Sequence, residues 1–233
     1  MPVLTKAPQL VFTHSTDDQQ GDIFAFPPNR ETLGGTAYLI VEQNAVETGN
    51  ILIDCPALNE TNREFIAQQG GIGSLFITHR GGMAQVLEFQ KAFDCQVIIQ
   101  EQEAYLLPTV TTQTFYRDCT LSDTSRAFWT PGHSPGSACF YYRHHGGVLF
   151  TGRHLIPTQS GVPQPLRLAK TFHWPRQLKF GQQMLTDFTP ETLSYICPGA
   201  NTGFLRGEKK INNAYAQLQS IDWEALKSAQ PVL

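Results

Sequence analysis

The sequence predicts a layered α/β protein with mixed β-sheets rather than a doubly wound parallel sheet. Strand-like and helix-like runs alternate between residues 51 and 99, which favours parallel pairing. Three short strand-like runs then follow one another between residues 126 and 151, which favours antiparallel pairing. A strand–helix unit closes the chain, and together these features indicate sheets that contain both kinds of pairing.

The chain begins with strands. Residues 9–13 and 23–26 are strand candidates. Residues 34–41 predict a strand that is entered through glycines, and residues 51–53 predict a buried strand that ends at Asp54. Since a polar turn separates these last two runs, they are expected to pair antiparallel.

Helices and strands alternate after this pair. Phe65 and Ile66 mark the apolar face of one helix, and Val86 and Phe93 lie near helical spacing in the next. The expected elements are a helix over 59–69, a strand over 75–77, a helix over 83–93, a strand over 95–99 and a short helix over 101–107. Residues 109–125 are polar and show no clear pattern.

The second half of the chain returns to short strands and then closes with a helix. The expected elements are strands over 126–130, 138–143 and 148–151, an irregular loop over 157–177, a helix over 177–188 and a strand over 193–197. An amphipathic helix is expected to follow, because Ile211, Ala214, Tyr215 and Leu218 fall at i, i+3, i+4 and i+7.

Composition places the chain among globular proteins, and its 233 residues suit one domain over residues 1–233. A net charge of −3 argues against a general nucleic-acid binder. The five cysteines form no C-x-x-C pair, so buried reduced thiols are expected. No apolar run approaches the roughly 20 residues of a membrane span. The N-terminus shows no signal-peptide pattern, so the expected location is the cytoplasm.

Two segments carry the candidate chemistry. LFITHRGGMA, residues 75–84, predicts a buried strand that delivers His79 at its C-terminal end, where α/β proteins place ligand-binding groups. TPGHSPGS, residues 130–137, predicts a glycine- and proline-rich loop that holds His133 between two strands. If the two histidines meet, they mark the functional site.

Five short segments, taken together, resemble the metallo-β-lactamase fold family in identity and in order. They are GGTAYLIV with ILIDCP, FITHRGGMA, TPGHSPGS, LFTGRH and ICPGANTG, and they cover about residues 34–205. The resemblance implies a four-layer αβ/βα sandwich with two mixed β-sheets. It also implies, for active members of the family, a site for two metal ions at these segments.

Most of the ligand positions that the resemblance implies are altered in this chain. His79 and His133 keep the family's histidines. The other five positions hold Gly81, Met83, Ala84, Arg153 and Ala200, the last of them beside Asn201. Asp54 matches an aspartate that supports the family's metal ligands. By this resemblance one metal keeps two ligands and the other keeps none, so no cofactor is expected. The alternative is one zinc or other divalent ion held by His79 and His133.

Arg153 reverses the sign of a position that bridges both ions in the family. Two unit charges ~4 Å apart interact by about 4 kcal/mol at an effective dielectric near 20, so the reversal costs up to roughly 16 kcal/mol beside a divalent ion. A structural zinc site supplies only about 10–16 kcal/mol. The guanidinium is therefore expected to fill the metal space. Arg206, Lys209 and Lys210 form either a solvated face or, with Arg80 and Arg153, an anion-attracting rim.

The candidate pocket comprises His79, Arg80, Gly81, His133, Ser134, Arg153 and Asn201. For His79 the alternative is a buried histidine that is hydrogen-bonded to Asp54 or to backbone. Strand alternation is expected to turn His154 away from the pocket. His173 and Trp174 form either a lid over the pocket or a hydrophobic anchor.

These residues favour a non-catalytic binding or regulatory protein whose arginine-lined pocket attracts a small anionic ligand. The alternative is a metal-dependent hydrolase of the thioester, lactone or phosphodiester class with a mononuclear or atypical site. Nucleic-acid processing is disfavoured by the acidic balance and the lost metal ligands. The sequence leaves open whether the protein binds a protein partner or forms a homodimer.

Overall fold

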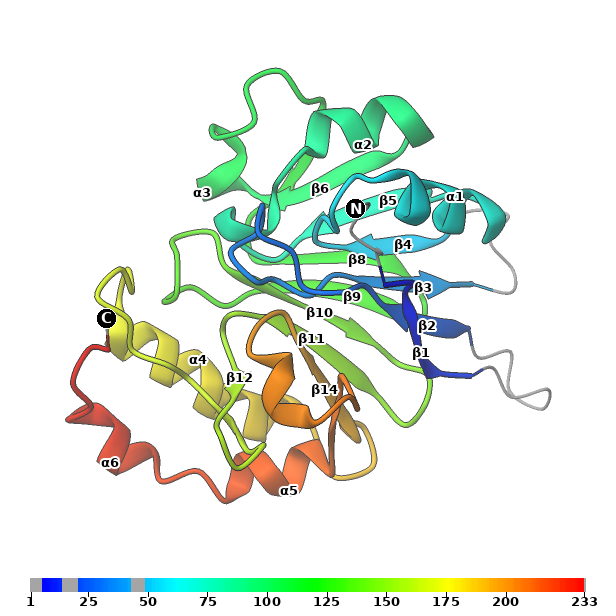
Figure 1. The fold of residues 1–233 in the computed structure, drawn as a ribbon. Helices are drawn as coiled ribbons and strands as arrows, with labels where there is room; N and C mark the ends of the chain where they lie inside the picture. The colour runs from blue at the N-terminus through cyan, green and yellow to red at the C-terminus, as the bar shows by residue number, and fades with distance from the viewer. Residues whose placement is uncertain (1–5, 14–20, 43–48, 233) are drawn as a thin grey trace.

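The computed structural model describes residues 6–13, 21–42 and 49–232. Its elements form four layers, with two β-sheets inside and helices on both outer faces (Figure 1). The helices over the first sheet are α1 (Glu60–Gln68) and α2 (Val86–Phe93); those over the second are α4 (Trp174–Asp187), α5 (Ala214–Gln219) and α6 (Trp223–Lys227). The predicted αβ/βα sandwich is confirmed.

In the part of the chain that the structure describes, the first sheet has seven strands in chain order. They are β1 (Gln9–Phe12), β2 (Asp22–Ala25), β3 (Tyr38–Val41), β4 (Ile51–Ile53), β5 (Ser74–Ile77), β6 (Gln96–Gln100) and β7 (Thr112–Phe115). β1 to β4 pair antiparallel, whereas β4 to β7 pair parallel, because α1, α2 and α3 (Glu101–Ala104) lie in the crossovers between the later strands. The antiparallel pairing expected for residues 34–41 with 51–53 is confirmed as β3 with β4.

The second sheet has six strands among the described residues. In spatial order they are β15 (Ile211–Asn212), β14 (Tyr195–Pro198), β11 (Val148–Gly152), β10 (Ala138–Tyr142), β9 (Ser125–Trp129) and β8 (Asp118–Ser122). β11 and β14 pair parallel and the other neighbours pair antiparallel, so this sheet is mixed as well.

Aromatic side chains fill the space between the two sheets. The rings of Phe76 and Phe140 lie 5.3 Å apart, and so do those of Tyr38 and Phe150. Side chains alternate along each strand, so Tyr38 faces this inner core while Leu39 packs under α1 and α2. The strand ends that carry the candidate residues therefore extend from strands that are packed in the core.

Several element boundaries differ from those predicted. α2 begins at Val86 rather than at Met83, because Arg80–Gly82 forms the short 3₁₀ helix η1 and Gln85 has a φ of 58°. Ile211 lies in β15 and not on the closing helix, since Asn213, with a φ of 53°, breaks the chain direction before α5.

Two stretches are more regular than predicted. Residues 109–125 contain β7 and β8, which are the edge strands of the two sheets and therefore keep polar sequences. Residues 157–177 contain part of a small hairpin, β12 (Ile156–Pro157) with β13 (Pro163–Gln164), and the first turn of α4.

No helix in the described residues combines the length and the apolar character needed to cross a membrane.

Replacing Gly152 with alanine is expected to destabilise the fold. Gly152 ends β11 with a φ of 52°, and a Cβ at this position would overlap the Thr78 hydroxyl. The left-handed backbone and the overlap together should lower the free energy of unfolding by about 3 kcal/mol. Urea unfolding of Gly152→Ala measures the loss. Gly203→Ala is the matched control, because a Cβ at Gly203 has no atom within 4 Å; equal stability of the two variants would contradict the expectation.

Candidate functional site

The ends of three chain segments meet at one edge of the sandwich. Thr78 and His79 follow β5, residues 130–137 join β9 to β10, and Arg153 follows β11. Backbone hydrogen bonds join these ends. Ala138 N donates to Thr78 O at 2.8 Å, which links the second sheet to the first, and Gly199 N donates to Gly152 O at 2.7 Å within the second sheet. The strand ends are thus hydrogen-bonded to one another.

His79 and His133 do meet. Their ring centroids lie 5.2 Å apart at an interplanar angle of 69°. His79 is 3% exposed, and its Nδ1 lies 2.9 Å from the Thr78 hydroxyl. Its Nε2 is buried and has no hydrogen-bond partner; a Cβ at Gly81 would lie 2.9 Å from it. The glycine therefore leaves room beside Nε2.

The predicted alternative for His79 is a buried histidine hydrogen-bonded to Asp54 or to backbone; His79 is buried, but its hydrogen-bond partner is the Thr78 hydroxyl. The Asp54 carboxylate lies 4.0 Å from Nδ1 and instead accepts two hydrogen bonds from Thr78, from N at 2.8 Å and from Oγ1 at 2.6 Å. Burial raises the pKa of Asp54 to about 6, against the effects of the Thr78 hydrogen bonds and of Arg153. Asp54 thus acts on His79 through Thr78.

The Arg153 side chain is anchored at the pocket by residues that the sequence reasoning missed. Its Nη2 donates to the carbonyls of Thr32 at 3.1 Å and Leu33 at 2.8 Å. Its Nε is buried without a hydrogen-bond partner. Burial lowers the pKa of Arg153 and the Asp54 carboxylate raises it. In the sequence, only the glycines after residue 33 indicated that the loop with Thr32 and Leu33 approaches the site.

Both histidines are held in the neutral form at pH 7. Burial lowers the pKa of His79 well below its usual value, and it lowers that of His133 to about 4. The cations Arg153 and Arg80 act in the same direction. A positive charge at this edge therefore comes from arginine and not from imidazolium.

A cavity of about 390 Å³ opens beside Arg153, and we call it the Arg153 cavity. Its polar lining is His133, Arg153, Asn201 and Thr202. The rest is apolar or glycine: Pro28, Leu33, Gly34, Ile156, Leu166, Leu168, Ala200 and Gly203. A cationic group at one wall and aliphatic side chains on the others suit an anion that carries an apolar part.

Arg80 and Ser134 have partners within the protein. Arg80 Nε donates to Glu103 Oε1 at 3.0 Å, and Ser134 Oγ lies 2.8 Å from Ser137 Oγ. The fully buried Glu103 also accepts from Gly136 N at 3.3 Å. Glu103 on α3 (Glu101–Ala104) thus ties the segment after His79 to the loop that holds His133; no sequence pattern indicated this.

The remaining histidine candidates, His154 and His173, do not line the Arg153 cavity. His154 is buried, its pKa is lowered to about 3 by burial, and its carbonyl accepts from Gln177 Nε2 at 3.0 Å. His173 caps α4 by accepting from Arg176 N at 3.2 Å. Trp174 is buried and donates to Leu226 O at 2.9 Å, which makes it an anchor rather than a lid.

The three C-terminal cations, Arg206, Lys209 and Lys210, lie in different surroundings. Lys209 Nζ donates to Thr202 Oγ1 at 3.2 Å and so reaches the wall of the Arg153 cavity. Lys210 Nζ instead lies 4.2 Å from the Phe12 ring centroid, and Arg206 is exposed.

The side chains present do not fit the two-metal site that the resemblance implies. In the described ranges, no group of three or more His, Cys, Asp or Glu side chains stands close enough to hold a metal ion. His79 and His133 offer two imidazoles, whereas a catalytic zinc takes three protein ligands. The Arg153 charge opposes a cation beside them.

The buried His154 predicts a loss of stability in mild acid. A depressed pKa stabilises the fold above the unfolded value of 6.5, and that stabilisation is lost as the pH falls toward about 3. Between pH 6.5 and 4 the loss should be about 3 kcal/mol. Urea unfolding across this range measures it. His154→Gln should flatten the slope by that amount; an unchanged slope would contradict the assignment.

Comparison with protein-family models and with curated protein sequences gives no match. Comparison with solved structures gives matches. The DIM-1 metallo-β-lactamase has a TM-score of 0.64 at 12% identity, over 88% of this chain and 96% of that one. A protein solved in a di-iron-bound form has 0.58 at 20% identity, over 78% and 92%. A quorum-quenching N-acyl homoserine lactone lactonase has 0.56 at 15% identity, over 84% and 93%. This chain has the metallo-β-lactamase fold.

Proposed function

We propose that the chain is a non-catalytic binding or regulatory protein whose Arg153 cavity takes a small anionic ligand. The observation that carries the proposal is the arrangement of the Arg153 side chain. Nη2 is held by two carbonyls, while Nε is buried without a partner and Nη1 makes no hydrogen bond within the described residues. A fixed guanidinium with free donors is suited to a carboxylate or a phosphate.

The unpartnered Nε gives the ligand a source of affinity. A buried donor that lacks a partner carries a desolvation penalty of about 1–3 kcal/mol, and more when it belongs to a charged group. An anion that accepts from Nε removes that penalty on binding. The aliphatic walls, among them Ile156, Leu166 and Leu168, would add affinity for a ligand with a hydrocarbon part.

The lost ligand positions support a binding role over hydrolysis. Solved hydrolases share the fold, but here Gly81 and Arg153 stand at two of the family's ligand positions. Arginine can neutralise an anion, but it cannot lower the pKa of a bound water as a metal ion does. The five cysteines are free and buried, which supports a location in a reducing compartment such as the cytoplasm.

Metal analysis and ligand titration together test the proposal. Protein purified without chelator is expected to hold well under one zinc, iron or manganese ion per chain by elemental mass spectrometry. Calorimetric titration with phosphate and with hexanoate is expected to show binding that Arg153→Gln weakens at least 10-fold. Arg206→Gln, which removes an exposed arginine outside the cavity, is the matched control. A tightly held stoichiometric metal, or equal affinity in both variants, would overturn the proposal.

A hydrolase with one metal is the second candidate, and one observation favours it. His79 Nε2 is a buried nitrogen without a hydrogen-bond partner, and it faces the space at Gly81 near the His133 ring. Such a nitrogen is free to take a ligand. A panel of thioesters, lactones and phosphodiesters, with and without added zinc, tests this candidate. Turnover that disappears in both His79→Ala and His133→Ala would support it, and a flat panel would reject it.

A further inference from the structure

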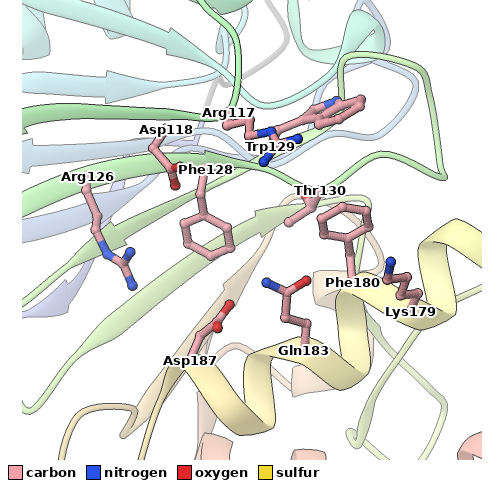
Figure 2. Close-up of a pocket in the computed structure, with 10 residues that line it drawn as sticks. All are labelled: Arg117, Asp118, Arg126, Phe128, Trp129, Thr130, Lys179, Phe180, Gln183 and Asp187. Carbon is pink, nitrogen blue, oxygen red and sulfur yellow. The ribbon is translucent and has the colours of Figure 1, made fainter.

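A second cavity lies apart from the two histidines, where α4 leaves part of β8 and β9 uncovered (Figure 2). Its volume is about 380 Å³, and we call it the α4 cavity. The residues that line it are Arg117, Asp118, Arg126, Phe128, Trp129, Thr130, Lys179, Phe180, Gln183 and Asp187. It shares no lining residue with the Arg153 cavity.

One part of the α4 cavity is aromatic. Figure 2 shows Trp129 and Phe180 together on one side of Phe128. The Trp129 and Phe180 ring centroids lie 6.1 Å apart at an angle of 53°. Trp129 Nε1 donates to Pro135 O at 2.8 Å, and Tyr116 stacks on the indole with centroids 6.3 Å apart. The indole is thus fixed in place, so a planar ring can pack against it at little entropic cost.

The other part of the α4 cavity is charged. Asp118 and Arg126 lie on the opposite side of Phe128, and Asp187 points up from α4 beneath them (Figure 2). The Arg126 guanidinium lies 5.4 to 5.7 Å from the ring centroids of Phe128, Tyr141 and Phe188, which holds it in position.

Although Arg126 packs against aromatic rings, these three charged side chains form no ion pair in the described residues. The ion pairs in the described part of the chain involve His79, Arg80 and Lys227, so Asp118, Arg126 and Asp187 have none. Their side chains make no hydrogen bond there either. A ligand could therefore pair with them without breaking an existing bond.

We propose that the α4 cavity binds an α-amino acid with an aromatic side chain. Such a molecule carries an ammonium and a carboxylate on the same carbon atom. Arg126 can take the carboxylate, Asp118 and Asp187 can take the ammonium, and the ring can pack against Trp129 and Phe180. An uncharged aromatic ring would leave Asp118, Arg126 and Asp187 unpaired.

Calorimetric titration with L-tryptophan and L-phenylalanine tests the proposal. Both are expected to bind at least 10-fold more tightly than 3-phenylpropionate, which lacks the ammonium, and than phenethylamine, which lacks the carboxylate. L-Alanine, which lacks the ring, should bind at least 10-fold more weakly as well. If the three analogues bind as tightly as the aromatic amino acids, or if neither aromatic amino acid gives heat at millimolar concentration, the proposal is overturned.

Substitutions in the α4 cavity test whether the amino acid binds there. Asp187→Asn changes one exposed oxygen to nitrogen, and Arg126→Met removes the charge while keeping an apolar stem over Phe128. Each is expected to weaken L-tryptophan binding at least 10-fold. Arg143→Gln, which alters an exposed arginine outside the cavity, and Arg153→Gln should bind as the wild type does. Unchanged binding in Asp187→Asn and Arg126→Met, with urea unfolding showing both folded, would place the ligand elsewhere and overturn the proposal.

Discussion

The two hydrogen bonds from Thr78 to the buried Asp54 carboxylate are the constraint on which the site depends. They fix the exit of β5, and the same threonine orients His79 through its hydroxyl. Its carbonyl accepts from Ala138 N, which joins the first sheet to the second. Gly152 fits against the Thr78 side chain because it has no Cβ, and the next residue is Arg153. One threonine thus sets the positions of both candidate groups.

The protonation states at the site follow from the positions of Asp54 and Arg153. Asp54 is a buried carboxylate whose ionised form is disfavoured, and the nearby Arg153 cation offsets part of that penalty. Burial lowers the pKa of His79 and of His133, and the same cation lowers both further. A pair of metal ions would also place positive charge at these strand ends, but it would act as a Lewis acid, whereas a guanidinium only donates hydrogen bonds. Arg153 therefore places positive charge at these strand ends without acting as a Lewis acid.

Sequence patterns predicted what local residues determine and missed what distant residues determine. The apolar runs predicted the central strands, and the order of five segments predicted the sandwich. The edge strand β7 was missed because Thr112–Phe115 buries little. Glu103 and the carbonyls of Thr32 and Leu33 were also missed, because each acts on a partner that lies 23 to 121 residues away. Such contacts leave no trace in local periodicity.

The same contacts explain how the strand ends are held in place although the described residues offer no group of three or more metal-ligating side chains. In a site assembled by metal coordination, removing the ligands would release the loops that carry them. Here His79 is held by Thr78, the His133 loop is held by Glu103 through Gly136, and Arg153 is held by two carbonyls. None of these hydrogen bonds uses a metal ion. The strand ends therefore present their side chains at fixed positions, and new binding chemistry can arise by single substitutions there.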